Sequence, residues 1–123
     1  MGLKKVPGLE AEQLAAKYLR RQGYRMLAER CLTGYGELDL ICRVGRTLVF
    51  VEVKSAARGA GIDPEEKIGA EKIAHIVKSA KAWLQQKKLS GLKVRFDVVA
   101  VDLAKKPPEF RHYPASFESP FDF

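Results

Sequence analysis

Two acidic residues and a lysine, spread over two neighbouring apolar segments, are the side chains of this sequence best suited to metal-dependent chemistry. Asp39 lies in the first segment, Gly36–Cys42, and Glu52 and Lys54 lie in the second, Thr47–Lys54. Carboxylate oxygens are ligands for hard divalent cations such as Mg²⁺ and Mn²⁺, which keep waters for substrate phosphates. A lysine two residues from a metal-binding carboxylate can position or deprotonate a water, or hold a phosphate oxygen.

A tight turn between the two segments would bring these residues together. Both segments are predicted strands, and Gly45–Arg46 between them is typical of a two-residue hairpin turn. Such a turn sets Asp39 directly across from Glu52. The same register sets Glu37 across from Lys54. Opposed residues, and residues two apart on one strand, share a face of the sheet, so all four side chains are expected on one face.

This arrangement has two interpretations. Opposed carboxylates repel each other, and a divalent cation between Asp39 and Glu52 would compensate that repulsion. Alternatively, Glu37 and Lys54 form an ordinary cross-strand ion pair, while the other two acids are solvated at the end of the sheet. A turn longer by one residue would also remove the alignment. The spacing alone leaves both interpretations open.

The elements that position the hairpin follow from the hydrophobic periodicity. It predicts a helix between Gly8 and Gly23, a strand over 24–31, the hairpin, a loop over 55–61, a helix that starts near Asp63 and ends at Ser90–Gly91, and a strand over 94–103. The order α-β-β-β-α-β predicts an α/β (α+β) fold, a mixed β-sheet with flanking helices. Residues 104–123 are expected to form an irregular C-terminal tail.

The composition limits the class of protein. A chain of 123 residues suits a single domain, 1–123. Lys and Arg total 22 against 15 Asp and Glu, a net charge of +7 that favours a polyanionic partner such as nucleic acid. No apolar run is long enough to span a membrane, so no membrane partner is expected. Cys31 and Cys42 lack metal-site spacing, which favours a reduced, cytoplasmic protein without a zinc site or disulfide.

The segment Lys72–Phe96 holds seven basic residues and no acid. Helical spacing places Lys78 and Lys81 together, and Lys88 extends their row by seven residues. Such a row could follow a phosphate backbone, and its binding would then weaken steeply with salt. The alternative is an ordinary solvated helix face.

Three motifs together resemble the YraN-like family, an uncharacterised bacterial family of small proteins. They are G-E-L-D-L-I at 36–41, V-F-V-E-V-K at 49–54 and R-F-D-V-V at 95–99. The resemblance extends from Gly8 to about Phe117. It implies a restriction-endonuclease-like core and places the chain with the PD-(D/E)XK nuclease superfamily, to which archaeal Holliday-junction resolvases also belong.

The resemblance implies catalytic roles for five residues. Asp39 and Glu52 match the family's metal ligands, and Lys54 matches the motif lysine. Glu12 matches a helix glutamate that in related nucleases helps to bind a metal or its waters. Lys72, at the start of the main helix, matches a lysine that often stands near the site and would also contact the nucleic acid. The implied cofactor is Mg²⁺ or Mn²⁺.

Three functional hypotheses remain. The first is a metal-dependent endonuclease that acts on DNA, branched or structured, as a homodimer by analogy with enzymes that cut two strands symmetrically. The second is a catalytically inactive nucleic-acid-binding module of the same fold, since Ala56 stands where the family usually has an arginine. The chain also has Ala11, Cys31 and Thr33 where the family usually has glycine, asparagine and arginine. The third is an interaction protein that assembles through its aromatic tail.

Overall fold

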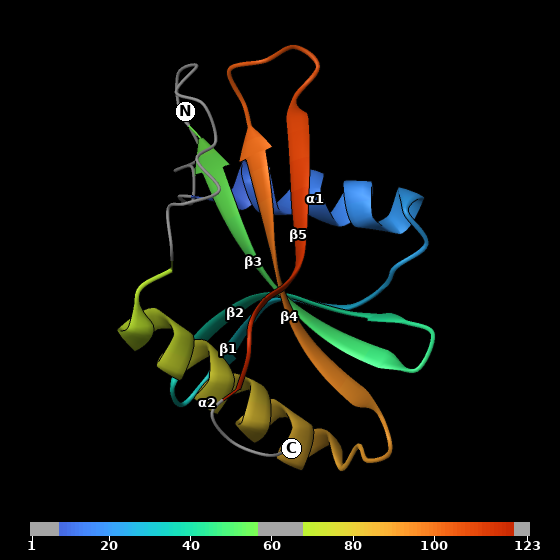
Figure 1. Ribbon diagram of the computed structural model, residues 1–123, viewed down its shortest axis with the longest axis vertical. Coiled ribbons are helices and arrows are strands. Elements are labelled where there is room, and N and C mark those ends of the chain that lie inside the picture. Colours follow the sequence, from blue (N-terminus) through green and yellow to red (C-terminus); the bar gives the residue numbers. More distant parts are fainter. Residues whose placement is uncertain (1–7, 57–67, 120–123) are drawn as a thin grey trace, which may run out of the picture.

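Two helices and five strands make up the computed structural model, which describes residues 8–56 and 68–119 (Figure 1). The elements are α1 (Leu9–Arg21), β1 (Arg25–Thr33), β2 (Gly36–Val44), β3 (Thr47–Ala56), α2 (Ala70–Lys87), β4 (Lys93–Asp102) and β5 (Glu109–Phe117). The helix start predicted near Asp63 lies outside the described residues. The loop predicted over 55–61 begins with two residues that belong to β3, and its remainder also lies outside the described residues.

The five strands form one mixed sheet in the order β1-β2-β3-β4-β5. β3 and β4 are parallel, and every other neighbouring pair is antiparallel. A parallel pair needs a long crossover connection, and α2 lies within it. The predicted α+β fold, a mixed sheet with flanking helices, is therefore confirmed.

The two helices cover opposite faces of the sheet. Successive strand residues point to opposite faces, so Val49 and Val51 pack with α1 while Leu48 and Phe50 pack with α2. The α1 side also holds Ala11, Ala15, Ala16, Leu19, Leu40, Cys42, Val99 and Val101. The α2 side also holds Leu38, Ile41, Ile76, Val77, Ala80, Trp83 and Phe96. Each helix therefore fixes one side of the hairpin that carries the acidic residues.

The ends of both helices follow from local chemistry. α1 has Glu10 and Glu12 in its first turn and basic residues in its last, which suits the helix dipole. α2 ends at Lys87, because Lys88 takes a left-handed backbone with φ 54°. The end predicted at Ser90–Gly91 is therefore wrong by a few residues. Lys88 consequently lies at the cap of the helix and not on the predicted helical row. Neither described helix is long and apolar enough to cross a membrane.

The tail predicted to be irregular contains an additional strand, β5, which pairs antiparallel with β4. Its aromatic residues pack on neighbouring elements: Phe110 stacks on Tyr18 of α1 with ring centroids 4.7 Å apart, and Phe117 stacks on Phe96 at 5.1 Å. The sequence conceals this strand because Pro114 interrupts it. The pairing register shifts there, and Ala115 has a positive φ of 52°, as in a bulge.

Candidate metal and active site

The β2–β3 hairpin has the predicted register over its first five pairs and then separates. Pairing runs from Val44 with Thr47 to Leu40 with Val51, as the Gly45–Arg46 turn requires. Among the described strand residues, the ladder does not continue to the predicted pairs of Asp39 with Glu52 and Glu37 with Lys54. The Asp39 carboxylate instead accepts a hydrogen bond from the backbone N–H of Val53 at 2.9 Å.

This side-chain bond explains how β3 can leave β2. The N–H of Val53 has the Asp39 carboxylate as its partner in place of a carbonyl of β2. On its other side β3 stays paired with β4 as far as Ala56. The acidic residues of β2 and β3 therefore lie where the two strands part.

Glu12 reaches Asp39 from the first turn of α1. One carboxylate oxygen each from Glu12, Glu37 and Asp39 lie within 4.8 Å of one another. Glu12 is anchored by Arg30 of β1, whose Nη1 donates to Glu12 Oε2 at 2.7 Å, and Arg30 Nη2 lies 3.4 Å from Glu37 Oε1. Arg30 makes these contacts from a left-handed backbone with φ 50°. Glu12 and Asp39, both predicted as metal ligands, are thus brought together, with Glu37 as a third acid.

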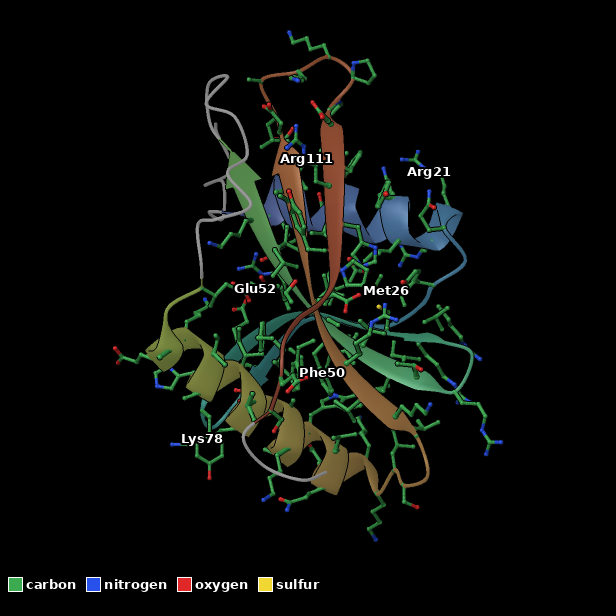
Figure 2. The ribbon with its side chains drawn as sticks, in the orientation of Figure 1. Arg21, Met26, Phe50, Glu52, Lys78 and Arg111 are labelled. Carbon is green, nitrogen blue, oxygen red and sulfur yellow. The ribbon has the colours of Figure 1, made fainter. Side chains whose placement is uncertain are left out.

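Glu52 lies on β3 toward the first turns of α2 (Figure 2). Its side chain is only 10% exposed, and its Oε1 is 3.3 Å from Lys72 Nζ. Burial, together with the negative charge of Asp39, raises the pKa of Glu52 to about 7 despite the opposing effect of Lys72. The charge of Glu52 raises the pKa of Lys72 in turn. The two residues predicted for the site from β3 and α2 are therefore in contact.

The pKa of Glu12 is raised for the same reasons as that of Glu52. Its burial raises its pKa, the nearby Asp39 raises it further, and Arg30 lowers it only in part. Four acids meet in this region, namely Glu12, Glu37, Asp39 and Glu52. Arg30 forms ion pairs with Glu12 and Glu37, and Lys72 forms one with Glu52. Carboxylates gathered so closely favour a divalent cation as a further partner.

The donor set also suits such an ion by its chemistry. Mg²⁺ and Mn²⁺ take oxygen ligands, usually a few carboxylates, and complete their coordination with water. Glu12, Glu37 and Asp39 could share one ion, and Glu52 lies next to Asp39 on the α2 side. No sulfur or imidazole ligand is part of this acidic group, so it does not resemble a zinc site.

The predicted lysines are distributed unequally around the acids. Lys54 is half-buried and lies two residues beyond Glu52 on β3, so it emerges on the same face. Lys78, Lys81 and Lys88 are all exposed, and Lys78 on α2 points away from the sheet (Figure 2). These three lysines belong to the outer surface of α2 and its C-terminal cap, not to the acidic site. Glu37 forms an ion pair with Arg30 of β1.

Sequence reasoning assigned no role to Arg30 and did not include Glu37 among the ligands. Arg30 is separated from Glu12 by 18 positions, and nothing in its neighbours marks it as the partner of a helix glutamate. Glu37 carried a usable signal, because it stands two residues before Asp39. Its share in the group depends on how β2 twists as it leaves β3, which spacing does not reveal.

A second buried carboxylate, Asp97 of β4, has a different environment. Arg95 donates to both of its oxygens, from Nε at 2.8 Å and from Nη2 at 2.7 Å, and the N–H of Ala115 donates at 2.9 Å. His112 Nε2 lies 2.7 Å away, and it must donate because a carboxylate only accepts. Burial alone would raise the pKa of Asp97, but these hydrogen bonds lower it below its ordinary value. Asp97 and Arg95 thus form an ion pair on one strand, with the carboxylate fully buried.

Comparison with known proteins supports the resemblance found in the motifs. The sequence model of the family described as "Uncharacterised protein family UPF0102" matches residues 11–101. A UPF0102 protein of Anaeromyxobacter dehalogenans is 42% identical over 111 residues, covering 90% of this chain and 83% of the relative. A UPF0102 protein of Syntrophotalea carbinolica is 40% identical over 111 residues, covering 90% of each chain.

A third relative matches a shorter part of the chain at a similar identity. The UPF0102 protein of Thermotoga maritima is 44% identical over 93 residues, which cover 75% of this chain and 82% of the relative. The matched region of the family model contains Glu12, Asp39, Glu52, Lys54 and Lys72 and ends before β5. On these matches, the chain belongs to the UPF0102 family.

Proposed function

We propose that the protein is a metal-dependent endonuclease that hydrolyses phosphodiester bonds in DNA, with branched or structured DNA as its substrate class. The observation that carries the proposal is the group of carboxylates, part of it buried, where β2 leaves β3. Glu12, Glu37 and Asp39 offer three oxygens within 4.8 Å, and the pKa values of Glu12 and Glu52 are both raised. Titratable groups perturbed in this way are concentrated at functional sites.

The proposed cofactor is Mg²⁺ or Mn²⁺, held by Asp39 with Glu12 and Glu52, and also by Glu37, whose carboxylate lies in the same group. When bound, such an ion lowers the pKa of a coordinated water and stabilises charge on the phosphate under attack. The chain's own lysines complete the site. Lys54, on the same face as Glu52, would orient the water or the scissile phosphate, and the exposed Lys72 would stabilise the negative charge that develops beside it.

A second candidate function is nucleic-acid binding without catalysis. The exposed lysines of α2, Lys78 and Lys81, lie outside the acidic site and could hold a phosphate backbone with or without a metal ion. In either case the partner would be nucleic acid. For the nuclease we propose a homodimer, since symmetrical cutting of two strands needs two sites. We propose a cytoplasmic location, which the free thiols of Cys31 and Cys42 support.

The decisive experiment is a cleavage assay on labelled branched DNA, linear duplex DNA and RNA, with Mg²⁺, Mn²⁺ or EDTA. Wild type is compared with Glu52→Gln and Asp39→Asn. The matched control is Glu29→Gln, which alters an exposed ion pair with Arg20 outside the site. We expect metal-dependent cutting by wild type and by the control, and a loss of about 100-fold or more in both site variants.

The same assay separates the two functions. Salt-sensitive binding by wild type and Glu52→Gln alike, with no cleavage under any condition, would favour the binding module. Cleavage that survives Asp39→Asn at the wild-type rate would refute the assignment of the metal site.

A further inference from the structure

Two large apolar side chains are exposed where β1 connects to β2, Leu32 near the end of β1 and Tyr35 in the turn. Leu32 is 80% exposed and Tyr35 is 56% exposed, more than the other exposed large apolar residues of the described chain, Leu27 and Leu89, at 39% and 42%. Single apolar residues on a surface are common and need no explanation. This pair differs in two respects, its rigidity and its position beside the acidic site.

The turn is held in place by the Thr33 hydroxyl. This hydroxyl accepts a hydrogen bond from the N–H of Tyr35 at 3.1 Å and lies 2.8 Å from the carbonyl oxygen of Gly36. It also lies 2.8 Å from Oγ of Ser79, a buried residue in the middle of α2. Figure 1 shows the β1–β2 connection beside α2. Leu32 and Tyr35 are therefore presented by an ordered turn, so little further ordering is needed when they bind a ligand.

The turn lies between the acidic site and the lysines of α2. Tyr35 precedes Glu37 by two residues, Leu32 pairs with Glu37 across the two strands, and Glu37 belongs to the group of three acids. On the other side, the contact with Ser79 joins the turn to the part of α2 that also carries the exposed Lys78, the preceding residue. An aromatic side chain beside surface lysines is the combination by which proteins hold single-stranded nucleic acid, with bases stacked on rings and phosphates near cations.

We propose that Tyr35, with Leu32 beside it, stacks against an unpaired base next to the scissile phosphate, so that the site takes single strands or the single-stranded part of a branched substrate. The position of the scissile phosphate rests on the proposed nuclease function, whereas the stacking does not. An intact duplex offers Tyr35 no base face except at its ends, because each base is already stacked on its neighbours. A duplex would therefore bind through the lysines alone.

The test is a binding measurement in EDTA, where no cleavage occurs. The probe is a fluorescein-labelled oligothymidine of about 16 nucleotides, at the upper end of the site size for one small domain. The same length of blunt duplex is the comparison, and fluorescence anisotropy gives Kd. We expect Tyr35→Ala to weaken single-strand binding about 10-fold, within the range for loss of one base–aromatic stack. Duplex binding should stay within about twofold, since the phosphate contacts are unchanged.

Three further variants control the result. Tyr35→Phe keeps the ring and should retain wild-type binding. Leu32→Ala should weaken single-strand binding by a smaller factor than Tyr35→Ala. Leu27→Ala removes an exposed leucine from the other end of the same strand and should bind as wild type does. Thermal melting of every variant checks that the exposed substitutions leave the fold intact.

Several outcomes would overturn the stacking proposal. Equal binding by Tyr35→Ala and wild type, or an equal loss on single strand and duplex, would do so. Sedimentation that shows a dimer in wild type and a monomer in Leu32→Ala would instead make the turn a contact surface between copies. The nuclease function is tested separately. If Tyr35→Ala weakens only single-strand binding but wild type cleaves nothing in Mg²⁺ or Mn²⁺, the stacking is supported and the nuclease function is refuted.

Discussion

The two ends of α1 lie near two carboxylate sites with opposite electrostatics. At its start, Glu12 adds a charge to a group of acids that already contains Asp39 and Glu37. Just beyond its end, Tyr24 accepts a hydrogen bond from Arg95, which holds Asp97 with two further donors. The first site has more acids than cations. The second site has a single acid, Asp97, and Arg95, His112 and the N–H of Ala115 all donate hydrogen bonds to it.

The pKa shifts express this difference. Burial penalises a charged carboxylate in both places, and at Asp97 the hydrogen bonds outweigh that penalty and lower the pKa. At Glu12 and Glu52 burial and the neighbouring charge of Asp39 act in the same direction, and the pKa values rise. Asp97 therefore stabilises the fold in its charged form, whereas the acids around Asp39 oppose folding unless a cation joins them. The comparison distinguishes a carboxylate that holds the sheet together from a group suited to binding a ligand.

The largest expected effect comes from the same chemical change made in both sites. Asp97→Asn removes the charge that Arg95 and His112 share, and should lower the free energy of unfolding by about 3 kcal/mol or more at pH 8, as for other broken buried pairs. Asp39→Asn keeps an oxygen for the N–H of Val53 and removes a repelled charge, so stability in EDTA should not fall. Urea unfolding with equal m-values measures both. Similar losses in the two variants would remove the distinction between the sites.

The second prediction concerns the addition of a divalent cation, Mn²⁺, to the acidic site. Mn²⁺ at about 100 times its Kd should stabilise wild type by about 2.7 kcal/mol, because it binds the folded protein and not the unfolded chain. The gain should be lost in Asp39→Asn and greatly reduced in Glu37→Gln. Glu29→Gln, which leaves the site untouched, should gain as much as wild type. Thermal melting with Mn²⁺ and with EDTA gives the four differences, and an equal gain in Asp39→Asn would place the ion elsewhere.

Much of the fold could be predicted because its signals are local. The hydrophobic period marked α1 and α2, and one glycine-containing turn set the register of β2 against β3. β5 was not predicted, because Pro114 and the bulge at Ala115 break the alternation of apolar and polar residues by which a strand is recognised. Its stability comes from stacking on distant residues such as Tyr18, which no local pattern reveals.

The candidate site could be predicted only in part, for the same reason. The turn register brought Asp39 and Glu52 near each other, and the family motif added Glu12 and Lys72. The separation of the strands beyond Leu40 and Val51 was not predictable, because it depends on a side chain taking a backbone N–H. Arg30 was not predictable either, since its contact with Glu12 spans 18 positions and needs an unusual backbone angle.

A third, smaller effect is a pH dependence that belongs to the acidic site. In EDTA, folding raises the pKa of Glu52 from its ordinary 4.5 to about 7, so the folded state binds the extra proton between these values. The stability that protonated Glu52 contributes is complete below pH 4.5 and is lost as the pH rises through 7. Glu52→Gln cannot ionise, and should match wild type near pH 4 and exceed it by about 2 kcal/mol at pH 8.

The measurement is urea unfolding of both proteins in EDTA from pH 4 to pH 8. Glu29→Gln serves as the control and should track wild type across the range, because its carboxylate is exposed. An advantage of Glu52→Gln that grows toward acid pH would have the wrong sign and would show that ionised Glu52 is stabilised in the folded protein, as Asp97 is.

The smallest expected effect concerns Lys72, and it tests whether the chain can neutralise its own acids. Lys72 Nζ lies 3.3 Å from Glu52, but the lysine side chain is 55% exposed, so water and salt weaken the attraction. A double-mutant cycle of Lys72→Met and Glu52→Gln at pH 8 should therefore give a coupling of only about 0.5 kcal/mol, smaller still in 1 M salt. Removing Lys72 should also move the pH transition of Glu52 upward. A coupling of about 3 kcal/mol, insensitive to salt, would mean that Lys72 compensates the charge of Glu52 as fully as Arg95 compensates that of Asp97. The excess of negative charge that distinguishes the two sites would then disappear, and the acidic site would no longer need a cation.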